Sequence, residues 1–91
     1  MKVKMFDKEW EVKDINYKEK RELWQLSLSS FAGSEVVQEK YFDMINKVEE
    51  LSGLSEKDYV HKDKNLLTMA EIDLLLQEVF ASYMSTEKKD S

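Results

Sequence analysis

The chain has 91 residues, 42% of them hydrophobic and 36% charged, and its net charge is −5. This length suits one domain, and the composition is typical of a folded chain rather than a disordered one. The absence of cysteine excludes disulfides and thiolate metal sites. The acidity argues against general nucleic-acid binding, which relies on Lys and Arg to neutralise phosphates.

The apolar residues are too dispersed for a membrane protein. No run approaches the roughly 18 to 20 apolar residues that a transmembrane helix needs. The N-terminal segment alternates apolar and charged residues instead of forming the apolar core of a signal peptide. We therefore expect a cytoplasmic protein that does not bind membranes.

Residues 2–13 alternate apolar and charged side chains around a short polar step, which is typical of a β-hairpin. A turn at residues 7–8 predicts a register with apolar pairs on one face and opposite charges on the other: Met5 with Trp10, Val3 with Val12, and Lys4 with Glu11. A two-stranded hairpin is marginal alone, so its apolar face is expected to pack on helices.

The first helix is expected over residues 17–32. Asn16 is a good N-cap, and Glu19 stands at the capping-box position three residues later. Gly33 suits the left-handed position that ends a helix, and Ser34 is placed to cap the next one.

The second helix is expected over residues 35–52. Its apolar residues repeat with a period close to 3.6, opposite a charged face: Val37, Tyr41, Met44, Ile45, Val48 and Leu51. Gly53 and Leu54 form a Schellman-type stop. The polar stretch that follows is expected to be a loop with at most one short helical turn.

The third helix is expected over residues 69–84. Thr68 and Glu71 form a capping box at its start. Residues 85–91 are small or charged and are expected to be a disordered tail. These elements predict a single domain over residues 1–84 of the α+β class, mostly α, with an N-terminal two-stranded hairpin packed on a three-helix bundle.

No residue pattern indicates a reaction, a cofactor or a metal. His61 is the only histidine, and its charged neighbours predict a solvated loop position without the base and nucleophile pairing that catalysis needs. The second and third helices carry too few cations for a helix-turn-helix DNA reader. We expect a protein that is not an enzyme and binds neither cofactors nor nucleic acid.

The aromatic and methionine content exceeds what one core face per helix can use. The chain has two Trp, four Tyr, four Phe and five Met. These side chains either complete a compact core or dock a partner helix or a second copy of the chain, because such residues are enriched at recognition surfaces. The sequence leaves both readings open, as it does monomer and homodimer.

The N-terminal third resembles small tailed-bacteriophage proteins of the tail assembly chaperone type. The resemblance lies in the hairpin run MKVKMFDKEWEV over residues 1–12, followed by Tyr17-x-x-Lys20-Arg21-Glu22-Leu23. It implies a short hairpin before a helical body, and a non-enzymatic role in which the protein keeps a long helical tail component soluble in the host cytoplasm. Asp7 departs from the glycine that often occupies this turn, and no functional residues transfer.

An apolar groove flanked by acidic surface would suit an amphipathic helix as ligand. The side chains expected to contact such a protein partner are Trp24, Leu28, Leu74, Phe80 and Met84. Two other functions remain open: a small self-associating structural or virion subunit, and an acidic regulatory adaptor.

Overall fold

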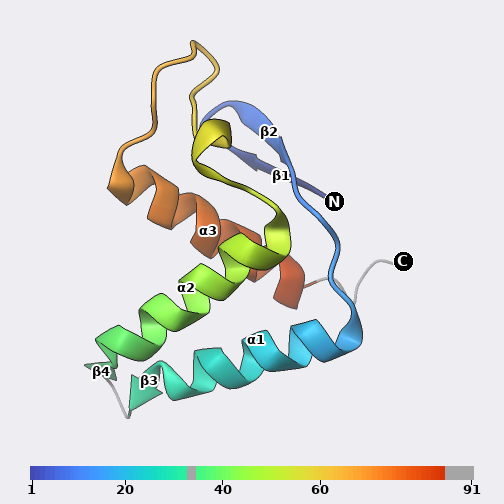
Figure 1. The fold of residues 1–91 in the computed structure, drawn as a ribbon, viewed down its shortest axis with the longest axis vertical. Helices are drawn as coiled ribbons and strands as arrows, with labels where there is room; N and C mark the ends of the chain where they lie inside the picture. Colours follow the sequence, from blue (N-terminus) through green and yellow to red (C-terminus); the bar gives the residue numbers. More distant parts are fainter. Residues whose placement is uncertain (33–34, 86–91) are drawn as a thin grey trace.

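A β-hairpin and three helices make up the protein, and the computed structural model describes residues 1–32 and 35–85. The strands are β1 (Lys2–Met5) and β2 (Lys8–Glu11), and the helices are α1 (Tyr17–Ser29), α2 (Gln38–Ser52) and α3 (Met69–Met84). Figure 1 shows α1 and α2 running in opposite directions, with α3 crossing behind α2 towards the start of α1. Because α3 contacts β1 as well as α1 and α2, the expected mostly helical α+β fold is confirmed.

The two strands pair in a register that differs by two residues from the expected one. Val3 lies opposite Trp10 and Met5 opposite Lys8, so the predicted pairs of Met5 with Trp10 and of Val3 with Val12 are wrong. Side chains alternate along a strand with a period of two, and a slip of two residues therefore leaves the same side chains on the buried face. Val3, Trp10 and Val12 are accordingly all buried.

The register follows from the turn, which is at Phe6 and Asp7 and not at residues 7–8. Both residues have a left-handed φ of 58°. A two-residue hairpin turn with positive φ at both positions matches the twist of the strands, but it favours Asn, Asp and Gly over Phe. The same shift places Lys4 opposite Glu9, in place of the predicted Glu11.

α1 begins at Tyr17 through the predicted capping box. The Glu19 N–H donates to Asn16 Oδ1 at 2.8 Å, and the Asn16 N–H donates to Glu19 Oε1 at 3.0 Å. The helix ends at Ser29, so the predicted end at residue 32 is wrong. Ser30 is the C-cap residue, and its N–H and its hydroxyl both donate to the carbonyl of Leu26, at 3.0 and 2.8 Å.

A second, very short hairpin joins α1 to α2, and the sequence did not predict it. β3 (Phe31–Ala32) pairs antiparallel with β4 (Glu35–Val36). The predicted start of the second helix at residue 35 is therefore wrong, and α2 begins at Gln38 with Val37 as its N-cap. Gly33 and Ser34, expected to end one helix and cap the next, lie outside the described residues.

α2 ends where the sequence predicts, at Ser52. Gly53 takes the left-handed conformation with a φ of 81°, which a side chain would make costly. One turn of 3-10 helix, Glu56–Asp58, follows within the predicted loop.

α3 has the predicted bounds, and its predicted capping box is confirmed. The Glu71 N–H donates to Thr68 Oγ1 at 3.2 Å, and the Thr68 N–H donates to Glu71 Oε1 at 2.9 Å. Ser85 follows the last helical residue. The rest of the expected tail, residues 86–91, lies outside the described residues.

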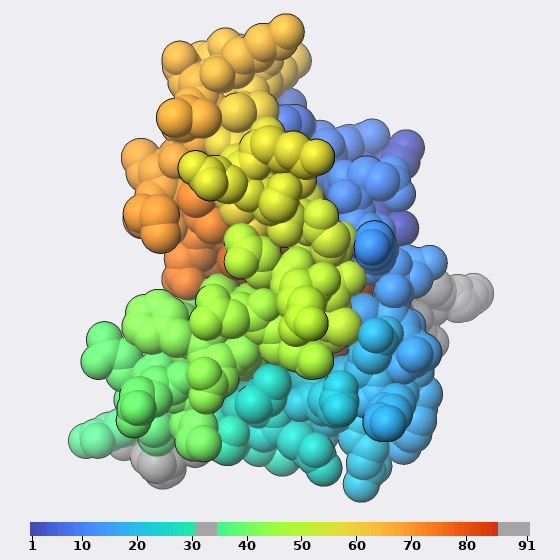
Figure 2. All heavy atoms as spheres, in the orientation of Figure 1, coloured from blue at the N-terminus to red at the C-terminus, as the bar shows by residue number. Residues whose placement is uncertain are grey.

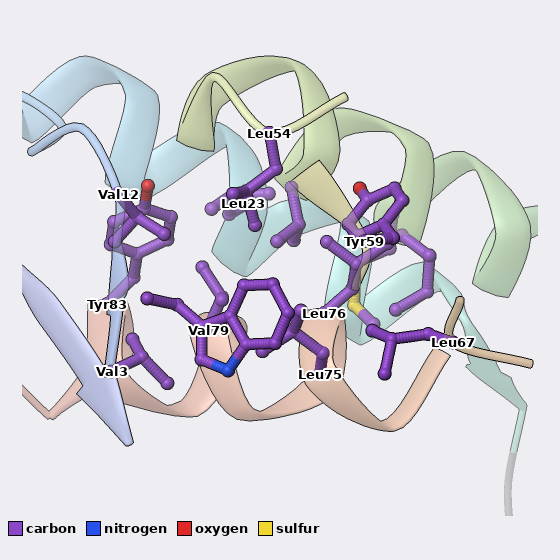
Figure 3. Packing of buried hydrophobic residues seen from close by; sticks show 14 residues of the cluster. Val3, Val12, Leu23, Leu54, Tyr59, Leu67, Leu75, Leu76, Val79 and Tyr83 are labelled. Carbon is purple, nitrogen blue, oxygen red and sulfur yellow. The ribbon is translucent and has the colours of Figure 1, made fainter. Parts of the chain in front are cut away.

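The core is shared between the hairpin, all three helices and the loop before α3. Figure 3 shows Val3 and Val12 from the hairpin side near Tyr83 and Val79 of α3, and Tyr59 from the loop near Leu76. The buried hydrophobic residues are Val3, Trp10, Val12, Leu23, Met44, Ile45, Val48, Leu54, Tyr59, Leu67, Leu75, Leu76, Val79 and Tyr83.

Two hydrogen bonds at Lys13 tie the segment between β2 and α1 to the other helices. The Tyr83 hydroxyl at the end of α3 donates to the Lys13 carbonyl at 2.6 Å, and the Lys13 N–H donates to the Ser52 carbonyl at 3.0 Å. Burial, with smaller effects from Asp14 and Glu19, raises the pKa of Tyr83 to about 12. The phenol therefore stays protonated and able to donate at neutral pH.

Candidate functional site

α1 presents three large apolar side chains to solvent. Tyr17, Trp24 and Leu28 are 75%, 52% and 58% exposed, whereas Leu23 on the opposite side of the same helix is fully buried. Residues spaced by seven and eleven positions lie on one stripe of an α-helix. The stripe therefore runs along most of α1, on the side that faces away from the core.

A groove lies beside this stripe, where the end of α3 meets α1. It has a volume of about 350 Å³ and is lined by Tyr17, Lys20, Arg21, Trp24 and Met84. Arg21 Nη1 donates to the Tyr17 hydroxyl at 3.4 Å, so the guanidinium lies along the stripe. The site thus combines aromatic and thioether surface with two cations on an otherwise acidic protein.

The five predicted contact residues do not form one continuous surface. Trp24 and Met84 line the groove together, and Leu28 continues the exposed stripe of α1. Phe80 and Met84 are half-buried and pack partly against the core. Leu74 is 47% exposed but does not line the groove.

Sequence reasoning missed Tyr17 and Arg21 as members of the site. In the sequence, Tyr17 marks the start of the helix and belongs with Arg21 to the motif of the family resemblance, but neither is a predicted contact. Their signal was the spacing, since Tyr17, Arg21, Trp24 and Leu28 follow one another at steps of four, three and four residues. That spacing defines one helix face as clearly as the core face does.

A second hollow separates the β1–β2 turn from the loop that leads into α3. Figure 2 shows this loop (yellow to orange) standing beside the hairpin (blue) at one end of the molecule. The hollow is open, has a volume of about 1270 Å³, and is lined by Lys4, Met5, Phe6, Asp7, Lys8, Glu9, His61, Lys62, Asp63, Asn65, Leu66, Thr68 and Glu71. Its lining contains both basic and acidic side chains, so its charge favours neither anionic nor cationic ligands.

His61 in this hollow is not the solvated loop residue that the sequence predicted. Its side chain is half-buried, its Nε2 lies 3.1 Å from Glu71 Oε1, and the Phe6 ring meets it edge-on at 5.7 Å. The hydrogen bond from the Thr68 N–H, followed by the interaction with His61, lowers the pKa of Glu71 below its ordinary value.

The pair of His61 and Glu71 has the geometry of an oriented base. Thr68 carries the one hydroxyl among the described residues that line the hollow, and that oxygen caps α3. The contacts instead fasten the loop to the start of α3 and to the hairpin turn. Lys8 supports the same arrangement, since its Nζ donates to the Val60 carbonyl at 2.9 Å.

Two further kinds of site are absent from residues 1–32 and 35–85. In that part of the chain, no three or more His, Cys, Asp or Glu side chains gather so that they could hold a metal ion. No helix of the same part has the length and apolarity to span a bilayer.

Comparison with known proteins adds no relative. No protein-family model, no curated protein and no solved structure matches the chain.

Proposed function

We propose that the chain is a non-enzymatic protein-interaction module that binds an amphipathic helix along the exposed stripe of α1. The observation that carries the proposal is the alignment of Tyr17, Trp24 and Leu28 on one outward face. Burial of each of these large side chains would be favourable, and the three share one helix face instead of lying scattered over the surface.

The groove beside the stripe suits a helical ligand in shape and charge. Helix-in-groove recognition uses apolar anchors on one helix face that enter a hydrophobic groove. Trp24 and Met84 provide the apolar wall, and Lys20 with Arg21 lies at the rim. A carboxylate on the ligand, next to its apolar face, would meet these cations and fix its register.

The resemblance of the N-terminal third to tail assembly chaperones leads to a finer form of the proposal. In this form the ligand is a segment of a long helical tail component, kept soluble until assembly displaces the module. A coding frame for such a component beside the gene of this chain would support the finer form, and a neighbourhood without one would count against it.

The proposal is testable by NMR with a synthetic amphipathic helix of about 18 residues, or five turns. The peptide carries leucines on one face and flanking glutamates. The Trp24 indole is exposed, whereas the buried Trp10 indole donates to the Met5 carbonyl at 3.0 Å. Binding on α1 is expected to shift the Trp24 indole signal and to leave the Trp10 signal in place.

Two variants make the test specific. Trp24→Ser is expected to abolish binding, which the backbone amide signals of α1 report because this variant has no indole at residue 24. Leu74→Ser, which removes an exposed leucine of α3 outside the groove, is expected to preserve binding. Signal changes confined to the hollow around His61, or equal loss in both variants, would contradict a docking site on α1.

A further inference from the structure

The exposed stripe of α1 has the spacing of a coiled-coil seam. Tyr17, Arg21, Trp24 and Leu28 are separated by four, three and four residues, as d, a, d and a positions of successive heptads are. All four face solvent on the one helix. Such a seam normally lies against a second helix, and within the described part of the chain no helix covers it.

The seam is complementary to itself when it is read in the opposite direction. Two antiparallel copies of α1 bring a positions opposite d positions, so that Tyr17 lies opposite Leu28 of a second copy and Arg21 opposite Trp24 of a second copy. The first pair is aromatic on aliphatic. The second places a guanidinium on an indole face, which is the favourable arrangement for a cation–π contact.

We infer that the helix which docks on α1 is α1 of a second copy of this chain, packed antiparallel about a two-fold axis near residues 22–23. This inference rests on the proposed function, since it names the occupant of the same surface, and it puts a second copy of α1 there in place of the tail component of the finer form. A two-fold interface must be self-complementary, with each contact made twice. The four-residue seam meets that condition through two kinds of pair, each repeated.

The flanking charges agree with the antiparallel arrangement and oppose the parallel one. About the same axis, Lys18 lies beside Gln25 of the second copy on one flank and Lys20 beside Ser27 on the other, and both of these partners are neutral. In a parallel pair, Arg21 would face Arg21 of the second copy at the centre of the seam, where like charges repel. Met84 extends the apolar surface beside Trp24 and would be covered by the second helix.

Sedimentation equilibrium measures the association directly. The chain is expected to shift from monomer towards dimer between about 10 μM and 1 mM, the range of a small interface. Trp24→Ser and Arg21→Glu are each expected to weaken dimerisation by about tenfold or more, because each change removes a contact that the symmetry repeats. Leu74→Ser is the matched control, since it lies off the seam and should leave the dimer unchanged.

Thiol crosslinking then determines the direction of packing, and the chain has no cysteine of its own to interfere. An equimolar mixture of Tyr17→Cys and Leu28→Cys is expected to give crosslinked dimers with a short bifunctional maleimide. Tyr17→Cys alone is expected to give almost none, because its two thiols would lie about 16 Å apart along the helices. Efficient crosslinking of Tyr17→Cys with itself would overturn the antiparallel packing.

Failure of this inference is distinguishable from failure of the proposed function. Self-pairing is refuted if the chain stays monomeric at about 1 mM protein in physiological salt. Helix docking on α1 still holds if the synthetic helix shifts the Trp24 indole signal of that monomer. If the chain is monomeric and the synthetic helix also leaves the Trp24 indole signal unchanged, both self-pairing and helix docking on α1 are refuted. Circular dichroism confirms that each variant retains the parent's helix content.

Discussion

α1 and α3 have the same kind of N-terminal cap, but they differ in how much of their surface the rest of the protein covers. Both begin at a reciprocal capping box, formed by Asn16 and Glu19 in α1 and by Thr68 and Glu71 in α3. α3 is surrounded by the hairpin, by α2 and by the loop that precedes α3. Its buried residues are Leu75, Leu76, Val79 and Tyr83. α1 buries only Leu23 and Ser27, and turns a comparable apolar face outward.

The comparison shows that local sequence signals start a helix but do not decide which of its faces is covered. A capping box supplies partners for a few backbone N–H groups and is equally effective on a buried or an exposed helix. Coverage depends on which elements pack nearby. α3 is central because both the hairpin and α2 pack against it, whereas α1 packs on one side only.

The largest expected change in unfolding free energy is at Leu75 of α3, and its neighbour Leu74 provides the comparison. Leu75 is fully buried and Leu74 is 47% exposed. Leu75→Ala is expected to lower the free energy of unfolding by about 2–5 kcal/mol, because it loses apolar burial and leaves a cavity. Leu74→Ala should change it by less than about 0.5 kcal/mol. Urea denaturation measures both, and similar losses would mean that Leu74 is also part of the core.

The next effect lies at the end of α3, where Tyr83 donates to the Lys13 carbonyl. Tyr83→Phe is expected to cost about 1 kcal/mol, since it removes this partly buried hydrogen bond. The folded pKa of about 12 lies above the ordinary value of 10, so the stabilisation is complete below pH 10 and is lost as the pH rises from 10 to 12.

The pH dependence checks the same contact a second way. Between pH 10 and 12 the parent chain should lose more stability than Tyr83→Phe, because the variant has no phenol at this position to ionise. Parallel stability curves over that interval would show that ionisation of Tyr83 does not destabilise the fold.

How far the sequence predicted the fold follows from how local each signal is. The start of α3 was predictable because its capping box is contained within four residues. The strand register was not, because a slip of two residues keeps the same side chains buried and only the turn at Phe6 and Asp7 distinguishes the two. The β3–β4 hairpin was missed because two-residue strands have no periodicity to detect.

The same reasoning applies to the candidate site. Trp24 and Leu28 were predictable as side chains in excess of one core face. The sequence could not say that Leu74 would lie away from the groove, because that depends on how α3 crosses α1. The contact of His61 with Glu71 was equally hidden, since it needs the loop to fold back over the start of α3.

A smaller effect distinguishes the two capping boxes. Glu71 Oε1 accepts from the Thr68 N–H and also contacts His61, whereas Glu19 Oε1 accepts from the Asn16 N–H at the cap of α1. Glu71→Gln is therefore expected to lower the melting temperature more than Glu19→Gln, though less than Tyr83→Phe. Equal shifts in thermal melts would mean that the contact with His61 adds nothing.

Acid titration tests the charge on Glu71 itself. Its folded pKa lies below the ordinary 4.5, so its stabilisation is present above pH 4.5 and is lost as the pH falls through the folded value. The Glu71→Gln variant should consequently lose less stability than the parent below pH 4.5. A variant that follows the parent curve would assign the acid sensitivity to other carboxylates.

The smallest expected effect on stability is at Leu28 on the outward stripe, and it sharpens the comparison most. Leu28→Ala should change the unfolding free energy of a dilute, monomeric sample by less than about 0.5 kcal/mol, because the side chain is 58% exposed. Leu23→Ala on the buried side of the same helix should cost about 2–5 kcal/mol. If Leu28→Ala destabilises only at high protein concentration, the stripe is stabilising an association and not the monomer. A loss at every concentration would instead make α1 a helix that, like α3, is packed on more than one side.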